Sequence, residues 1–555
     1  MREKRISGFL RNVAIAAVAA FAVCCKGDET ITEEAIFRAI TPVESELTIQ
    51  PGGSVSLNFF VTDPGFVFDY NVNSSGFQVV LRAGGGTPDR YSITNVTKGA
   101  GKGSYTATIT DLGKETDYRD EVQIGLRFEP GTSKEYCIYS SSFILKTEGA
   151  ESIIVRTGLP IVYINTENGK EITSKENYLN ATFSVNGSGA AEGLEEVTCR
   201  IRGRGNTTWT WPKKPYLVKF DEQQHLFGMH KHKRYVLLAN FMDRTLMRNI
   251  VSMKVSSMTN LDWTPGCQSV ELVLNGKHVG NYLLIEQVRV DKNRVPVTEM
   301  TPEDISGEAL SGGYLLECDF HFDNKFQWLS PYGHSAQWIW GRNDIVPFGI
   351  KYPDEDDINN TQINYIKDYV NSTAAALYGA DFQDPEKGYA AYIDVDSFID
   401  YWIVFEVMGN HELGNPGSVF MHKDRGGKLI AGPCWDFDWG VLSYKTSPHA
   451  KTGLVNGNAI WYARLFQDPA FKAKVKARFE ELLPQLETIP DFIDKTEKTL
   501  EQSAELNFAM WDPAQDASIN GGSIINGDEN MAFHEAVSLL KRIYSERLEV
   551  IKKSL

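Results

Sequence analysis

The chain has 555 residues, which is enough for two or more domains. Its composition, 42% hydrophobic and 11% aromatic, is that of an ordinary globular protein. The formal net charge of −16, with no large basic block, excludes a dedicated nucleic-acid-binding protein.

The first 25 residues follow the pattern of a bacterial lipoprotein signal peptide. Basic residues within positions 1–11 precede an apolar run over 13–23, which is too short to span a bilayer as a mature helix. The run ends at Cys24-Cys25, where Ala22 and Cys24 are the small residues that a signal peptidase would read. The sequence therefore predicts a lipoprotein signal peptide over residues 1–25 and lipidation of Cys25.

Residues 26–29 are an acidic and polar stretch, and they resemble the short signal that sends some lipoproteins to the cell surface. We therefore expect an outer-membrane lipoprotein of the cell envelope, exposed at the surface and held to the membrane by its lipid anchor. A plain secreted protein is the alternative.

Residues 26–40 read as a polar tether, and residues 41–148 have an all-β pattern. Short alternating or β-branched runs, such as 55–61 and 104–109, are separated by glycine-rich and aspartate-rich clusters. Strands at this spacing in about 110 residues are typical of an immunoglobulin-like sandwich. No cluster of acids, histidines or nucleophiles occurs there, so we interpret this domain as a spacer. Sugar binding is an alternative without support in the sequence.

The cysteines beyond residue 25 form no CxxC pair, so a zinc ribbon is not expected. Their number is odd and their spacing is wide. We interpret them as small buried hydrophobic residues, with one disulfide as an alternative. They are Cys137, Cys199, Cys267, Cys318 and Cys434.

A second domain is predicted over residues 152–555, after a boundary at 148–152. Its first distinctive stretch, 199–209, places Arg200, Arg202 and Arg204 at alternate positions with interleaved glycines. Guanidinium groups beside an approachable backbone suit phosphate. The alternative is a tight turn whose arginines pair with structural acids.

The segment 155–320 is predicted to be a mixed sheet with one clear helix, forming an upper lobe. The helix is expected over 243–255, with Asp243 as its capping acid. Asn275-Gly276 between alternating apolar runs predicts a hairpin whose second strand contains Glu286. A further strand is expected over 314–317.

The segment 360–555 is predicted to be a helical lower lobe. One amphipathic helix is expected over 363–377, and another over 398–408, capped by Asp396-Ser397. An acidic loop, a hairpin over 419–430 and a second acidic loop follow. Residues 461–555 read as mostly helix.

The second acidic loop contains Trp435-Asp436-Phe437-Asp438-Trp439-Gly440. In an extended segment, Asp436 and Asp438 would point to the same side. Two acids among apolar residues are costly unless positive charge balances them, and hard oxygen ligands suit magnesium or calcium. The alternative is an acid pair bonded to backbone amides or to an arginine.

Taken together, these stretches resemble the spore-coat protein H (CotH) kinase family over about residues 155–555. The resemblance implies an α+β fold with a two-lobed atypical protein-kinase-like domain, preceded here by an added sandwich. It also implies transfer of phosphate from ATP to protein serines with Mg²⁺. The matching stretches are Arg202–Trp209, Lys213–Tyr216, Val236–Asn240, Leu246–Asn249, Glu271–Gly276, Gly280–Glu286 and Trp435–Asp438.

Carried over position by position, the resemblance makes Asp436 the metal-binding acid, with Asp438 supporting it or sharing the metal. The family's other acid usually occurs as Asn-x-Asp, and here Asn410-His411-Glu412 makes Glu412 the candidate catalytic residue. Glutamate moves that carboxylate by one methylene, which can weaken or retune transfer. Ser418 stands where the family often has an asparagine.

The way in which protein kinases bind ATP suggests further candidates for binding the nucleotide. Lys219, in a predicted strand over 216–220, would contact phosphate with Glu286 as its acidic partner. Arg202 and Arg204 would contact phosphates as well. A solvated strand lysine is the alternative reading of Lys219.

The sequence is also compatible with two other functions. A catalytically inactive surface protein would bind a glycan or a partner protein through the same cleft, with Trp209 and Trp211 stacking on sugars. Hydrolysis by the paired carboxylates Glu412 and Asp436, as in glycosidases, is a weaker alternative.

Overall fold

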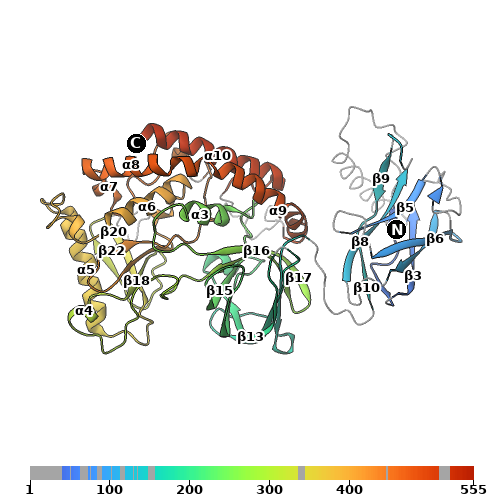
Figure 1. Ribbon diagram of the computed structural model, residues 1–555, viewed down its shortest axis with the longest axis horizontal. Helices are drawn as coiled ribbons and strands as arrows, with labels where there is room; N and C mark the ends of the chain where they lie inside the picture. Colours follow the sequence, from blue (N-terminus) through green and yellow to red (C-terminus); the bar gives the residue numbers. More distant parts are fainter. Residues whose placement is uncertain are drawn as a thin grey trace, which may run out of the picture. The chain divides into compact units, whose positions relative to one another are not determined.

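The computed structural model describes residues 40–555 except 51, 63–72, 75–76, 84–89, 102, 113–118, 129–130, 134, 148–156, 190, 335–343, 446–447 and 512–525. The predicted signal peptide, Cys25 and nearly all of the predicted tether lie outside these residues. The chain forms two compact units, one ending at Thr157 and one beginning at Gly158 (Figure 1). The fold is α+β, as the sequence predicts.

The first unit is built from strands in two sheets, with the orders β1-β3-β7-β6 and β2-β10-β8-β5-β4; β9 pairs with β8. Buried residues alternate along β7, and apolar side chains from both sheets, including Leu57 and Leu126, form one core. The strands are β1 Ile40–Pro42, β2 Glu46–Ile49, β3 Ser54–Val61, β4 Asn73–Ser74, β5 Phe77–Ala83, β6 Tyr91–Lys98, β7 Ser104–Asp111, β8 Arg119–Phe128, β9 Tyr136–Tyr139 and β10 Phe143–Thr147.

The second unit begins with a closed barrel in the order β11-β12-β13-β14-β15-β17-β16. Asn275 and Gly276, with φ of 51° and 72°, join β16 to β17, which confirms the predicted hairpin. The strands are β11 Ile161–Thr166, β12 Leu179–Asn186, β13 Leu194–Gly203, β14 Tyr216–Gln224, β15 His232–Leu238, β16 Cys267–Leu274 and β17 Lys277–Glu286.

Helix α3, Arg248–Ser256, lies between β15 and β16 in the chain and begins later than predicted. The N-cap position is Met247, not Asp243. The carboxylate of Asp243 nevertheless accepts the backbone N–H of Arg248, the first helical residue, at 2.8 Å, and that of Thr245 in the preceding turn at 2.9 Å.

A second sheet has the order β19-β20-β18-β21-β22, from β18 Tyr314–Cys318, β19 Gln327–Pro331, β20 Ile345–Tyr352, β21 Val419–Lys423 and β22 Leu429–Ala431. The predicted hairpin of β21 and β22 is confirmed. The prediction that 314–317 joins the upper-lobe sheet is wrong, because β18 pairs with β20 and β21. All of β18 is buried, and its sequence does not identify its partners.

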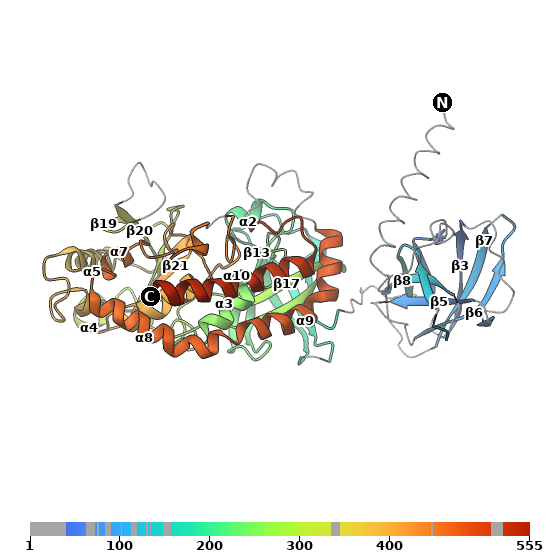
Figure 2. The same cartoon turned by 90° about the horizontal axis from the view of Figure 1, so that it is seen from above.

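The helices of the C-terminal part are α5 Asn360–Tyr378, α6 Val395–Val407, α7 Tyr462–Leu465, α8 Pro469–Leu486, α9 Ile489–Met510 and α10 Phe533–Ser554. Helices α8, α9 and α10 cover α3 and α6 (Figures 1 and 2). The cap predicted at Asp396-Ser397 is wrong, because the carboxylate of Asp394 accepts the N–H of Ser397 at 2.8 Å.

Cys137, Cys199, Cys267, Cys318 and Cys434 are all free, so the alternative of one disulfide among them is wrong. Burial raises the pKa of the Cys199 thiol to about 12, which fits the role of a small buried residue. Within the described ranges, none of the helices combines the length and the apolar character that a membrane crossing requires.

Candidate functional site

A cavity of about 660 Å³ lies between the barrel and the second sheet. The barrel contributes the loop after β13 and part of β15. The other side is formed by the end of β18, the loop after α6 and the loop after β22. Four of the residues predicted from sequence line this cavity, namely Arg204, Glu412, Asp436 and Asp438.

Arg204 enters the cavity because β13 ends at Gly203 and the chain turns there. Its guanidinium lies 5.7 Å from the ring centroid of Trp435. Gly205 follows with φ of +85°, and a Cβ at this position would lie 2.0 Å from Thr208 Oγ1. The tight turn after Arg204 therefore requires glycine.

Arg202 does not line the cavity. It lies within β13, and its guanidinium packs over the ring of Tyr178, 5.1 Å from the centroid. Of Arg200, Arg202 and Arg204, Arg204 alone lines the cavity, because it lies beyond the end of the strand.

Neither Lys219 nor Glu286 lines the cavity, and each has other partners than the predicted one. Lys219, in β14, pairs in register with Arg200 and Arg234, and desolvation together with these charges lowers its pKa. Glu286 ends β17. One of its carboxylate oxygens accepts the N–H of Gly266 at 2.9 Å, and the other lies 3.6 Å from Arg294 Nε.

Asp436 has a φ of 66°, so the loop is not the extended segment assumed from the sequence. Both aspartates nevertheless line the same cavity. Ser418 Oγ donates to Asp436 Oδ2 at 3.3 Å. Burial raises the pKa of Asp436, while the charge of Arg204 and this hydrogen bond oppose the rise.

Asp438 is repelled by two other carboxylates, those of Asp436 and Asp243. Its pKa is raised by burial first and then by the charges of Asp436 and Asp243. Burial lowers the pKa of Arg204, whereas its attraction to Asp436 and Asp438 acts in the opposite direction.

Glu412 lies in a single 3₁₀ turn, His411–Leu413, where Asn410 Oδ1 accepts the N–H of Glu412 at 2.9 Å. Burial raises its pKa well above the usual range, and the charges of Asp436, Asp438 and Asp319 raise it further. Glu412 therefore belongs to the same acidic group as the two aspartates.

A lysine that the sequence did not indicate also lines the cavity. Lys351, near the end of β20, forms an ion pair with Glu317 of β18 at 3.1 Å. Asp319 follows β18, and its Oδ1 accepts the N–H of His321 at 2.7 Å. The sequence contains one signal for the Lys351 ion pair, namely that the charged residue Glu317 ends an otherwise apolar predicted strand.

Three non-glycine residues of the cavity wall have left-handed backbone conformations: Asn240 at φ 49°, Ser418 at 54° and Asp436 at 66°. Such conformations cost free energy and gather at functional sites. Two of these residues, Ser418 and Asp436, also contact each other through their side chains.

The side chains of Asp436 and Asp438 are compatible with Mg²⁺. Their oxygens are hard ligands, and a dication would relieve the mutual repulsion of these acids. In the part of the chain that the structure describes, no three His, Cys, Asp or Glu side chains form a metal-binding group. Magnesium commonly uses one or two carboxylates and completes its shell with substrate phosphates and water.

Comparisons with known proteins add one informative result. A comparison with curated proteins gave no match. Among solved structures, a marsupial T cell receptor matches at 14% identity, over 35% of this chain and 60% of that chain, with a TM-score of 0.16. That likeness is too weak to support an argument about the fold. The family model for the CotH kinase protein matches residues 201–551. Because this match extends from β13 into α10, the chain belongs to the CotH kinase protein family.

Proposed function

We propose that residues 158–555 bind ATP with magnesium in the cavity and transfer the terminal phosphate to a serine of an acceptor protein. The observation that carries this proposal is the convergence of Arg204, Glu412 and Asp436 on one cavity. They come from three separate segments of a chain that belongs to the CotH kinase protein family.

The phosphates would be bound by the cations of the cavity wall. Arg204, Lys351 and Arg289 all line it, and guanidinium and ammonium groups form charge-assisted hydrogen bonds with phosphate oxygens. The glycine turn after Arg204 leaves room for close approach of the backbone. Lys351 takes the role that sequence reasoning gave to Lys219.

Asp436 and Asp438 would hold the magnesium ion. A bound magnesium ion supplies charge neutralisation for phosphate transfer. Without it, burial and then the charges of neighbouring carboxylates raise the pKa values of Glu412, Asp436 and Asp438.

Glu412 would accept the proton of the acceptor hydroxyl. It lines the cavity close enough to Asp436 for their charges to interact strongly. A carboxylate with a raised pKa is a stronger base once it is ionised, and general bases work best when their pKa lies near the working pH.

In this proposal the barrel is the upper lobe of an atypical kinase-like fold, and the second sheet with α5–α10 is the lower lobe. The first unit is an immunoglobulin-like spacer. Lipidation of Cys25 anchors the protein to the outer membrane, where it faces the cell surface and meets a protein acceptor or a glycan. The support for the anchor is the sequence pattern of residues 1–25.

Calorimetry of Mg-ATP binding to residues 26–555 tests the proposal, with Asp436→Asn as the matched variant. We expect binding by the wild type and its loss in the variant, together with labelling of an acceptor serine by the wild type alone. A wild-type protein that binds no Mg-ATP at millimolar concentration would rule out the kinase function.

Ser418 and Glu412 favour a second candidate function, a catalytically inactive surface protein that binds a glycan or partner protein. Both depart from the pattern of the family, and Ser418 bonds directly to Asp436. Trp211 and Trp439 line the cavity and stack on each other, with ring centroids 6.3 Å apart and an interplanar angle of 5°. Weaker retention of a Trp439→Ala variant on a polysaccharide would support this candidate.

A further inference from the structure

The loop Trp435–Leu442 contains Asp436 and Asp438, but it has no helix or strand. Its backbone polar groups must therefore find partners in other segments. Four of them do so through the side chains of Asn249, Asn526 and Arg248. The bonds are Phe437 N to Asn249 Oδ1 at 2.9 Å, Asp438 O to Asn526 Nδ2 at 3.1 Å, Gly440 N to Asn526 Oδ1 at 2.9 Å, and Val441 O to Arg248 Nε at 2.9 Å.

Asn526 makes the most extensive of these contacts. Its amide accepts a hydrogen bond from Gly440 and donates one to the carbonyl of Asp438, so it bonds to the chain on both sides of Trp439. The same Nδ2 also donates to Met242 O at 3.3 Å. Asn526 is only 4% exposed, so water cannot readily replace these bonds.

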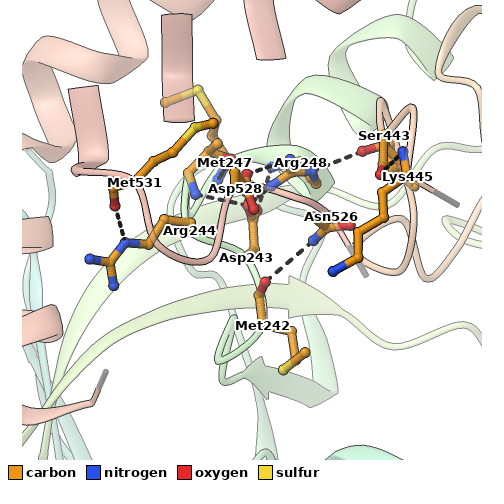
Figure 3. Close-up of polar contacts among 12 residues, drawn as sticks. Met242, Asp243, Arg244, Met247, Arg248, Ser443, Lys445, Asn526, Asp528 and Met531 are labelled. Carbon is orange, nitrogen blue, oxygen red and sulfur yellow. Dashed lines mark hydrogen bonds and ion pairs between the residues drawn. The ribbon is translucent and has the colours of Figure 1, made fainter. Parts of the chain in front are cut away.

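A buried ion network anchors the two segments that hold the loop. Arg248 lies between Asp243 and Asp528 and donates to both, at 2.7 Å in the case of Asp528 Oδ2 (Figure 3). Each of the three side chains is 1% exposed. Asp528 is two residues from Asn526, and Arg248 precedes Asn249 in α3. The network therefore fixes the position of both asparagines.

We propose that Asn249 and Asn526 are positioning residues, which hold the loop so that Asp436 and Asp438 face the cavity. This inference rests on the proposed function. Phosphate transfer depends on geometry, and a displacement of about 1 Å in a catalytic group can reduce the rate about 100-fold. Residues behind metal-binding ligands contribute about 10–100-fold to affinity or activity in other proteins.

The test uses Asn526→Ala and Asn249→Ala in the protein of residues 26–555. Arg248 is not suitable, because its removal leaves two buried carboxylates without a cation and can unfold the protein. Lys445→Ala is the matched control. It removes the 3.0 Å ion pair with Glu529, which joins the same two regions without bonding to the backbone of the loop.

We expect kcat and Mg-ATP affinity to fall about 10–100-fold in each asparagine variant at a temperature well below its Tm. The control should change either value by less than about fivefold, because the Lys445 side chain is half-exposed and bonds to no backbone group of the loop. A purely structural role would lower Tm while leaving kcat and affinity near their wild-type values. That result would overturn the proposal.

Hydrogen exchange of the ligand-free protein separates this inference from the proposed function. Peptides that cover Trp435–Leu442 should exchange faster in Asn526→Ala than in Lys445→Ala or the wild type. If the wild type binds no Mg-ATP, the proposed function fails, and faster exchange would still support the positioning of the loop. Unchanged exchange would overturn it whether or not the nucleotide binds.

Discussion

Two groups of buried carboxylates differ in their partners, one in the ion network of Arg248 and one in the cavity. Behind the loop, Asp243 and Asp528 share the guanidinium of Arg248, whose pKa is raised by these charges despite its burial. In the cavity, Glu412, Asp436 and Asp438 repel one another, with Arg204 as the nearby cation.

The difference separates a structural ion network from the acids of the candidate site. Carboxylates that share a buried cation stabilise a fixed arrangement, and breaking such a group is costly. Carboxylates that repel one another reduce stability until a positively charged ligand binds, which is typical of functional sites. Carboxylates therefore have opposite effects on stability in the two groups, and the charge of Asp243 acts on Asp438.

The largest expected effect is that of Asp436→Asn on phosphate transfer. In the proposed function Asp436 holds magnesium, so its loss should reduce kcat/KM by about 1,000-fold or more, because a bound metal would neutralise the developing charge. The Tm of the metal-free protein should not fall, because the substitution removes a repelling charge from the cavity. A variant that retains transfer, or one that unfolds, would contradict this account of the site.

The opposite outcome is expected behind the loop. Arg248→Met should lower the free energy of unfolding by about 3–5 kcal/mol, because it leaves Asp243 and Asp528 buried without their cation. Chemical denaturation of the variant beside the wild type measures this value. A loss below about 1 kcal/mol would mean that the network contributes no more than a surface ion pair.

Lys351 and Lys219 provide a smaller and more specific test. Lys351→Met should weaken Mg-ATP binding about 10-fold, because this ammonium lines the cavity, whereas Lys219→Met should leave the Kd nearly unchanged. Calorimetry on both variants gives the two values. The reverse ranking would restore the assignment made from the sequence.

The smallest effect concerns pH. The folded-state pKa of Asp438 is raised to about 8 from an ordinary value of 3.8, so the folded state binds the proton more tightly than the unfolded state. The associated stability is present below pH 3.8 and is lost as pH rises toward about 8.

Asp438→Asn should therefore match the wild type near pH 4 and exceed its stability by roughly 1 kcal/mol near pH 8, a modest value because Asp438 is only half-buried by surface area. Thermal unfolding in the presence of a chelator measures the difference. Equal Tm values at both pH values would show that Asp438 ionises normally.

Much of the fold could be predicted from local patterns. The dipeptide Asn275-Gly276 specified a hairpin, because both residues accept a positive φ. The apolar spacing within 363–377 predicted α5. The acid pair Asp436 and Asp438, in the loop after the second hairpin, predicted a metal site, and both residues line the cavity. The sequence also predicts four residues that line the cavity in the structure, namely Arg204, Glu412, Asp436 and Asp438.

Only the tertiary structure decided which lysine and which arginine reach the cavity, which sheet β18 joins, and that Asn526 holds a loop almost ninety residues earlier in the chain. The sequence by itself indicated the family, the hairpins and the acids that line the cavity, since dihedral preference and periodicity act over a few residues. The partners of a buried strand or amide depend on packing between distant segments, and no local pattern encodes that choice.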